Sequence, residues 1–182
     1  MHFRSRLVIF SIFLVAAFAV YGILIKNYSA VFNSFCTLLC LCAFALLHNK
    51  FPVLDNKTYC AFVIFIMLSV FAGKTLNMYA HIPYWDKFLH FSSGFIFASS
   101  GTQIYKKLKG DDKNHILMNL FVLSFSVALA GLWEIYEFSI DSLLGTTAQN
   151  GSLSDTMWDM IVGTLGTIIT IALISKKKNN GS

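Results

Sequence analysis

The sequence contains six apolar stretches, each long enough to cross a membrane as a helix. A helix rises about 1.5 Å per residue, so about 20 apolar residues cross a hydrocarbon core roughly 30 Å thick. In lipid every backbone group needs a hydrogen bond, and a helix supplies these bonds within one segment. The sequence therefore predicts an all-α polytopic membrane protein, a six-transmembrane-helix bundle at residues 7–25, 31–47, 59–79, 88–105, 116–140 and 156–175.

The composition supports a membrane protein rather than a soluble domain. Apolar residues make up 56% of the 182 residues and charged residues only 13%, and the mean hydropathy is +0.65. No linker rich in Gly, Ser or Pro divides the chain, so residues 1–182 are predicted to form a single transmembrane domain. Arg4 and Arg6 precede the first apolar stretch as in a signal peptide, but this stretch is longer than a signal core, and we expect the first helix to be retained.

The distribution of basic residues predicts the orientation. If the N-terminus is cytoplasmic, then all but three of the 14 Lys and Arg residues lie on the cytoplasmic side; the exceptions are Lys26, Lys74 and Lys87. Cytoplasmic loops are enriched in Lys and Arg, so both termini are predicted to be cytoplasmic. The positive charge is then a topology signal beside anionic lipid, and no nucleic-acid partner is expected.

Two helical segments carry the same polar spacing. Asp86, His90 and Gly94 follow one another at intervals of four, as do Asp155, Asp159 and Gly163. Residues four apart advance by about 40° around a helix, so each triplet faces one neighbour. We expect these two helices to approach closely at the glycines and to bring the four ionisable residues toward one cavity with the outer half of the fifth predicted helix.

Most of the acidic residues fall on the outer side of the predicted topology. On this side the predicted topology offers them Lys74 and Lys87 as cations. A group of carboxylates with so few cations should hold protons, bind a cation or face water. Six of the nine acidic residues are in this group: Asp86, Glu134, Glu137, Asp141, Asp155 and Asp159.

Structural roles are an alternative for each of these residues. Asp86 and Asp155 stand at helix starts, where a carboxylate caps the helix or favours the positive end of its dipole. Asp141 is compatible with a solvated loop. A purely structural cluster would also pair Lys74 with a glutamate and His90 with an aspartate.

The chemistry of the deeper residues favours a metal site. Imidazole and carboxylate groups together bind divalent ions such as zinc or manganese, with one position left for water. The candidate ligands are His90, Asp159, Asp155 and Asp86, with Glu137 as a further candidate, and Glu134 or Glu137 is the candidate catalytic base. The alternative is a pair of carboxylates, including Glu134 or Glu137, that shares a proton.

Three segments resemble a known family. Residues 82–90, 133–138 and 155–160, which read IPYWDKFLH, WEIYEF and DTMWDM, resemble the YjdF-like family of bacterial inner-membrane proteins. The similarity to VanZ-like proteins is more distant and rests on Asp-Lys-x-x-His, Gln149 and the final Asp-then-Gly pattern; Gly163 stands where that pattern has asparagine. The YjdF-like resemblance implies a multi-pass protein of the bacterial cytoplasmic membrane but no particular reaction.

These observations favour an enzyme with an outward-facing His and carboxylate site. Groups just below the outer interface can meet a lipid headgroup while its tails stay in the bilayer. The first hypothesis is therefore a metal-assisted hydrolase or transferase that acts on a membrane lipid or a lipid-linked envelope substrate. The second is a cation- or proton-linked transporter or permease, and the third is a non-catalytic membrane accessory protein.

Overall fold

The computed structural model describes residues 3–110, 114–149 and 152–179, and the regular structure in these ranges is entirely helical. This confirms the all-α prediction. The chain divides into two compact units, residues 1–85 and 86–182. The first unit contains α1 (Phe3–Leu24), α2 (Tyr28–Lys50), α3 (Asn56–Ile66), the π-helix η1 (Met67–Thr75) and the short α4 (Met78–His81); the second contains almost all of α5 (Trp85–Lys109), with α6 (His115–Leu144) and α7 (Leu153–Asn179).

The predicted stretch 59–79 is wrong at its C-terminal end, because η1 ends at Thr75 and Asn77, with a left-handed φ of 59°, separates it from α4. The other predicted stretches match the long helices, and the helices extend further at several ends. Polar caps explain part of this extension, since a side-chain oxygen can bind the free N–H groups of the first turn. Asn27 accepts a hydrogen bond from the backbone N–H of Ala30 (3.0 Å), and Asp55 accepts one from Thr58 (2.8 Å). Asn114 begins α6 in the same way.

Five helices in the described ranges are long and apolar enough to cross a membrane: α1, α2, α3 continued by η1, α6 and α7. The chain is therefore a polytopic membrane protein. The prediction of a sixth crossing concerns α5, which is less apolar because it carries charges at both ends and small polar residues between them. The single-domain assignment and the cytoplasmic termini also stay predictions.

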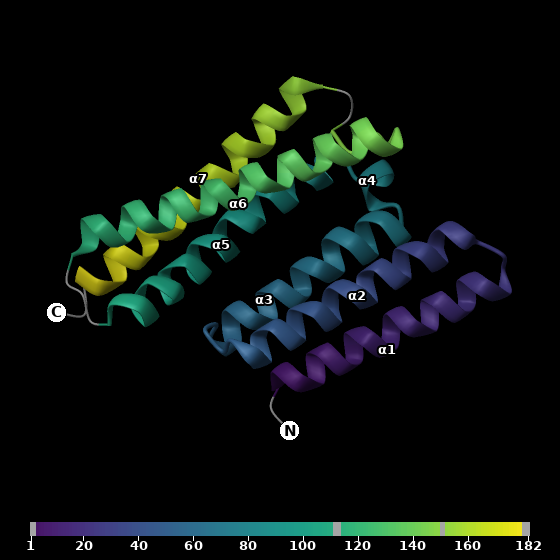
Figure 1. Cartoon of the computed structure of the whole chain (residues 1–182), viewed down its shortest axis with the longest axis horizontal. Helices are drawn as coiled ribbons and strands as arrows, with labels where there is room; N and C mark the ends of the chain where they lie inside the picture. Colours follow the sequence, from purple (N-terminus) through teal and green to yellow (C-terminus); the bar gives the residue numbers. More distant parts are fainter. Residues whose placement is uncertain (1–2, 111–113, 150–151, 180–182) are drawn as a thin grey trace. The chain divides into compact units, whose positions relative to one another are not determined.

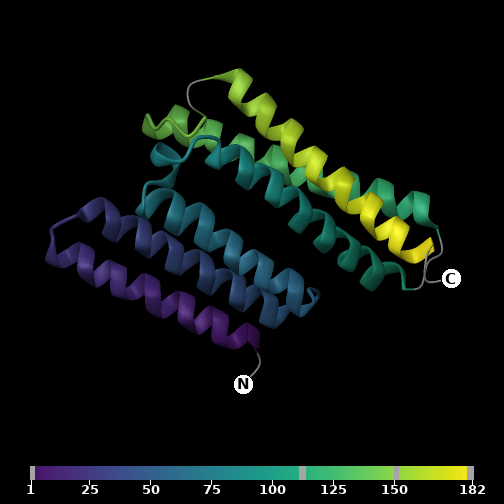
Figure 2. The ribbon, with the colours of Figure 1, turned by 180° about the vertical axis from the view of Figure 1, so that it is seen from behind.

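In the first unit, α1, α2 and α3 with η1 lie side by side (Figures 1 and 2). Val8, Leu41 and Val63 are buried together from three different helices. At the end of the unit where α1 begins, a nitrogen of the Arg4 guanidinium lies 3.0 Å from Nε2 of His48, in the last turn of α2. This contact joins the first and second helices beside the start of the third.

In the second unit, α5 and α7 run parallel and in register. A Cβ atom added to Gly94 would collide with the carbonyl oxygen of Gly163, and one added to Gly166 would collide with that of Phe91. The hydroxyl of Thr167 also contacts the carbonyl oxygen of Gly94 (3.3 Å). The predicted close approach of these two helices is thus confirmed. α5 lies along α7 where these glycines meet, and its crossing of the membrane stays a prediction.

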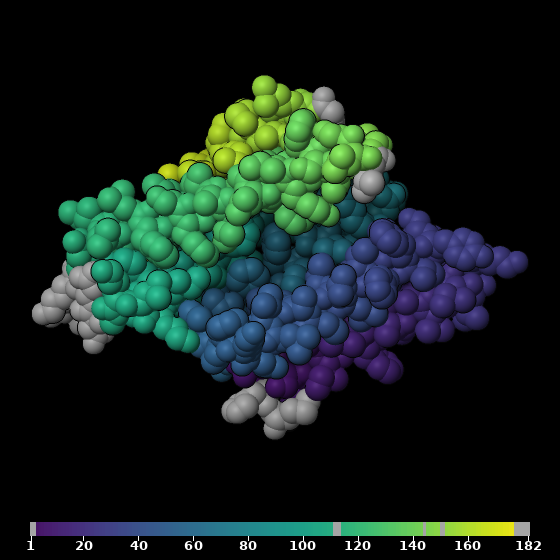
Figure 3. Space-filling model, in the orientation of Figure 1, coloured from purple at the N-terminus to yellow at the C-terminus, as the bar shows by residue number. Residues whose placement is uncertain are grey.

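The distribution of side chains in the second unit suits lipid as the surrounding solvent. Ser100, Thr102 and Ser126 are buried, and each hydroxyl donates to the carbonyl oxygen four residues earlier in its own helix. Large apolar side chains of α6, such as Leu120 and Leu132, are exposed instead, and α6 covers one face of this unit in the space-filling view (Figure 3). Small residues inside and large apolar residues outside are typical of helices packed in a membrane.

Candidate functional site

Five of the six predicted site residues meet at one end of the second unit, and Glu137 is not among them. Asp86 and His90 lie in the first two turns of α5, Asp155 and Asp159 in the first two turns of α7, and Glu134 in the last third of α6. α5 and α7 run parallel, and Gly94 packs against Gly163. The two polar triplets therefore lie at the same height along the two helices. We call these five residues, together with Lys87, the polar cluster.

Lys87 belongs to the cluster although it is in neither of the two triplets spaced by four residues. Its ammonium nitrogen lies 2.8 Å from Oδ1 and 2.9 Å from Oδ2 of Asp159. It also forms an ion pair with the carboxylate of Asp155, and Oδ2 of Asp86 is 3.8 Å away. The ammonium therefore bridges α5 and α7, and it balances part of the negative charge of the cluster.

His90 lies between three carboxylates and is buried. Its Nε2 atom is 3.7 Å from Oδ1 of Asp86 and 3.9 Å from Oδ1 of Asp159, and its Nδ1 atom is 3.8 Å from Oε1 of Glu134. These distances exceed those of hydrogen bonds, so the contacts are electrostatic. One ring nitrogen thus faces two aspartates and the other faces a glutamate.

Three of the four predicted metal ligands have a spacing that suits a metal ion. One ligand atom each from Asp86, His90 and Asp159 lies within 4.8 Å of the others. Two ligands of an ion with bonds of about 2.0–2.2 Å lie roughly 3–4.4 Å apart, and the separations from Nε2 of His90 fall in this interval. Asp155, the fourth predicted ligand, is engaged by Lys87 instead. A bound ion would share Asp159 with that lysine.

Glu134 is the most deeply buried candidate base. The residue is 6% exposed, and neither carboxylate oxygen has a hydrogen bond of ordinary geometry among the described residues. Its neighbours are His90, 3.8 Å away, and the hydroxyl of Thr156. A buried carboxylate is costly unless it is paired, so a site that retains one without hydrogen bonds is a candidate for binding or catalysis.

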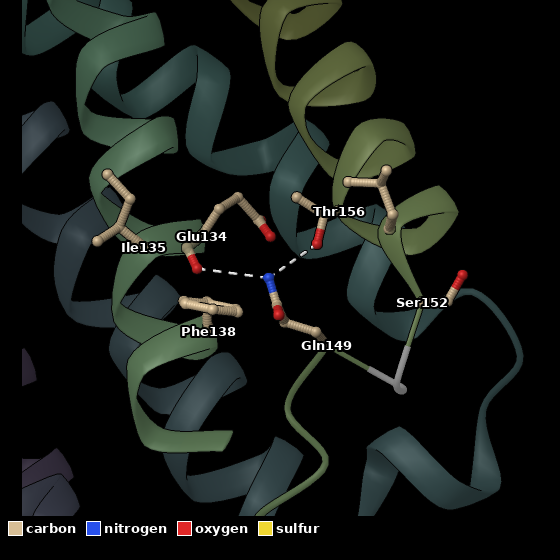
Figure 4. Close-up of a pocket in the computed structure, with 7 residues that line it drawn as sticks. Glu134, Ile135, Phe138, Gln149, Ser152 and Thr156 are labelled. Atoms are coloured by element: carbon tan, nitrogen blue, oxygen red, sulfur yellow. Dashed lines mark hydrogen bonds between the residues drawn. The ribbon is translucent and has the colours of Figure 1, made fainter. Parts of the chain in front are cut away.

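A pocket of about 420 Å³ adjoins this carboxylate. Figure 4 shows its lining, with Gln149 between Glu134 on α6 and Thr156 on α7. The Gln149 amide donates to the Thr156 hydroxyl (2.9 Å) and contacts the carbonyl oxygen of Glu134 (3.5 Å), so it joins α6 to α7. Ser152 and three exposed apolar residues complete the wall: Ile135, Phe138 and Leu153. The pocket therefore combines polar groups beside the cluster with an apolar, outward-facing rim.

The remaining acidic candidates on α6 have other partners. Glu137 accepts a hydrogen bond from the indole Nε1 of Trp133 on the same helix (3.0 Å). Asp141 accepts from the hydroxyl of Thr146 and from the backbone N–H groups of Ala148 and Gln149. Asp141 thus has a structural role, but it lies in the last turn of α6 and organises the loop that follows, whereas the structural alternative is a position within a solvated loop.

Comparisons with known proteins give a family but no reaction. A curated protein of Thermotoga maritima, named "Uncharacterized protein", is 33% identical over 115 residues, which is 62% of this chain and 59% of that protein. The chain thus aligns with less than two thirds of that relative's length. No solved structure matches. The YjdF-like resemblance is consistent with these findings but is not established by them, and none of them supports the similarity to VanZ-like proteins.

The family match covers nearly the whole chain, both units included. Residues 6–180 match the family described as "Predicted membrane protein (DUF2238)". This description agrees with the apolar helices and with the burial of small polar residues inside the second unit. On this evidence the chain belongs to the DUF2238 family of multi-pass membrane proteins.

Proposed function

We propose that the polar cluster is the active site of a membrane-embedded hydrolase or transferase that binds a divalent metal ion and acts on a lipid or lipid-linked substrate. The observation that carries this proposal is the position of His90 among Asp86, Glu134 and Asp159, next to a pocket with an apolar rim. We further propose that the membrane is the bacterial cytoplasmic membrane and that the cluster faces outward, as the distribution of basic residues predicts.

Asp86, His90 and Asp159 are the residues that would hold the ion, and a bound divalent ion would supply an activated water molecule as nucleophile. Nε2 of His90 faces the two aspartates, whereas Nδ1 faces Glu134. A carboxylate at the second ring nitrogen fixes the orientation and tautomer of a ligating histidine. Glu134 thus suits two tasks, orienting His90 and accepting a proton from a group in the pocket.

We assign the base to Glu134 rather than Glu137 because the Glu134 side chain is in contact with both His90 and the pocket. The pocket favours an amphiphilic substrate: its polar wall can bind a headgroup, while Ile135, Phe138 and Leu153 can contact acyl chains from the bilayer. A pocket of about 420 Å³ holds a headgroup and the adjoining part of a chain.

Metal content is the direct test. Purified protein should contain close to one divalent ion per chain by elemental analysis, and a chelator should lower the melting temperature, because a ligand of the native state stabilises it by mass action. His90→Ala and Asp159→Asn should each lose the ion. Glu137→Gln is the matched control on the same protein and should retain it. The proposal would be contradicted by a protein that contains no metal and whose melting temperature does not change when the chelator is added.

The enzymatic part needs a separate readout. The metal-loaded protein should convert one component of a total bacterial lipid extract, detected by mass spectrometry as a shortened or headgroup-free product. Glu134→Gln should retain the metal but slow this conversion by about 100-fold or more, as expected for removal of a general base. A metal-loaded protein that leaves every lipid unchanged would leave no basis for the enzyme.

The outward orientation can be tested by cysteine labelling in a variant whose four native cysteines are replaced by serine. Thr147→Cys lies in the loop after α6, near the cluster, and Lys109→Cys lies at the other end of α5; both positions are exposed. A membrane-impermeant maleimide should label position 147 in intact cells and position 109 only after the cells are opened. The reverse order would place the cluster on the cytoplasmic side.

The second candidate function is cation- or proton-linked transport, and the ion pairs of Lys87 favour it. The ammonium already balances Asp155 and Asp159 without a metal, which leaves His90, Asp86 and Glu134 as groups that can exchange protons. In that case metal-free protein in liposomes should dissipate a pH gradient or take up a cation, and Glu134→Gln should abolish the flux. Liposomes that remain as tight as protein-free ones would exclude this function.

A further inference from the structure

A second hollow lies in the first unit. Its residues precede those of the polar cluster in the sequence and differ from them in type. The hollow has a volume of about 550 Å³ and is formed by the first turn of α1 and by residues 56–64 of α3. Arg4 and Lys57 supply two positive charges to its wall, and no acidic side chain is among the described residues that line it. The charge of this hollow therefore suits an anionic ligand.

The guanidinium of Arg4 is held in place by its neighbours. One of its nitrogens lies 3.0 Å from Nε2 of His48, and its central carbon lies 5.4 Å from the centre of the Tyr59 ring. The His48 and Tyr59 rings are in turn in contact, with centroids 4.6 Å apart. Because Arg4 can only donate, Nε2 of His48 is the acceptor, and further N–H groups of the guanidinium remain for a ligand. A pre-oriented guanidinium is well suited to bind phosphate oxygens.

Apart from the polar Asn56, the rest of the wall is apolar and continues along α3. Cys60 and Ala61 are small, which creates the hollow, and Ile64 lies beyond them. Ile64 is seven residues after Lys57, or about 10 Å further along the helix. Phe3 and Ile64 are exposed, at 74% and 48%. The surface thus changes from cationic to apolar over the depth that separates a phospholipid headgroup from its acyl chains.

The position of the hollow suits a phospholipid. It lies at one end of α1 and α3, two helices long and apolar enough to cross a membrane, so its charged part is at the level of an interface and its apolar part faces hydrocarbon. The sequence predicts this end to be cytoplasmic, and the cytoplasmic leaflet is the anionic one. Asp55, the nearest acid in sequence, turns its carboxylate toward the backbone N–H of Thr58 (2.8 Å).

We propose that the hollow between Arg4 and Lys57 is a binding site for a single anionic phospholipid, whose phosphate contacts the two cations and whose acyl chain lies along Ala61 and Ile64. The site is independent of the proposed enzyme and of its metal. Its ligand is a membrane lipid and not a free phosphate ion, because the apolar wall would otherwise remain without a partner.

The experiment measures which lipid stays with the protein. The full chain is reconstituted in nanodiscs with equal parts of phosphatidylglycerol and phosphatidylcholine, released into mild detergent and examined by native mass spectrometry. Wild-type protein should retain phosphatidylglycerol in preference to phosphatidylcholine. Arg4→Gln and Lys57→Gln should each reduce that preference roughly five-fold, the effect of one basic residue at an anionic surface.

Arg6→Gln is the matched control, since Arg6 is exposed near the same helix end but does not line the hollow. It should change the preference less than two-fold, on the order of experimental scatter, because it removes only diffuse charge. An equal loss in Arg6→Gln, or no preference in the wild type, would overturn the proposal. If Arg4→Gln does not fold, Lys57→Gln decides, because the exposed Lys57 side chain is outside the core.

Two further arms distinguish the sources of the phosphate. Millimolar inorganic phosphate should not displace the retained lipid, and displacement would identify a free anion as the ligand. Ala61→Trp, which fills the apolar part of the hollow but leaves both cations, should also reduce lipid retention. Retention unaffected by this change would show that the acyl chain does not lie along α3.

Discussion

Glu134 and Asp141 are two carboxylates on one helix, seven residues apart, and they differ in burial and in hydrogen bonding. Asp141, at the end of α6, accepts three hydrogen bonds from the loop that follows it. Glu134, about 10 Å deeper, is buried without an ordinary hydrogen bond among the described residues. Asp141 stabilises the loop after α6 through these hydrogen bonds. The buried Glu134 has no such partners in that loop, and it is the residue to which we propose a catalytic role.

The largest expected change in stability comes from removing the Lys87 ammonium, which bridges α5 and α7. Lys87→Met should lower the free energy of unfolding by about 3 kcal/mol or more, because Asp159, which is 1% exposed, would keep a buried charge without its ion pair. Chemical denaturation of metal-free protein in detergent measures this change. The double variant Lys87→Met/Asp159→Asn should recover most of the loss. Equal instability of the single and double variants would mean that the ion pair is not the cause.

Asp141→Ala should have a smaller effect in the same direction. It removes the acceptor of two backbone N–H groups and one hydroxyl, so we expect a loss of about 1–2 kcal/mol, limited by water that can reach this half-buried loop. Thermal unfolding with the same protein preparation provides the measurement. Hydrogen exchange at Ala148 and Gln149 should rise in parallel. Unchanged exchange at those two amides would show that the loop is ordered by other contacts.

Glu134→Gln should give the smallest change and the opposite sign. The polar cluster contains four carboxylates against Lys87 and His90, so replacing one carboxylate by a neutral amide of the same shape relieves repulsion. We expect metal-free Glu134→Gln to be more stable than the wild type by about 1 kcal/mol, as is common where activity requires an unfavourable group. A clear destabilisation would identify Glu134 as a structural residue like Asp141 and would remove the contrast between them.

The sequence by itself determined the class of protein and which polar residues share a face of their helix with a glycine. Long apolar stretches leave the chain no alternative to helices in lipid, because the backbone must satisfy its hydrogen bonds within each segment. The interval of four placed Asp86, His90 and Gly94 on one face, and Asp155, Asp159 and Gly163 on another. The close contact of Gly94 with Gly163 follows from the same spacing.

Only the tertiary structure decided which of the polar groups meet. Lys87 is about 100° around the helix from Asp86, outside the predicted face, yet its long side chain reaches Asp155 and Asp159 on α7. Glu134 and Glu137 are equivalent by sequence, and the packing of α6 turns the first toward His90 while the second binds Trp133. Helical periodicity fixes the angle at which a side chain leaves its own helix, but the neighbour that it meets depends on the packing of all three helices.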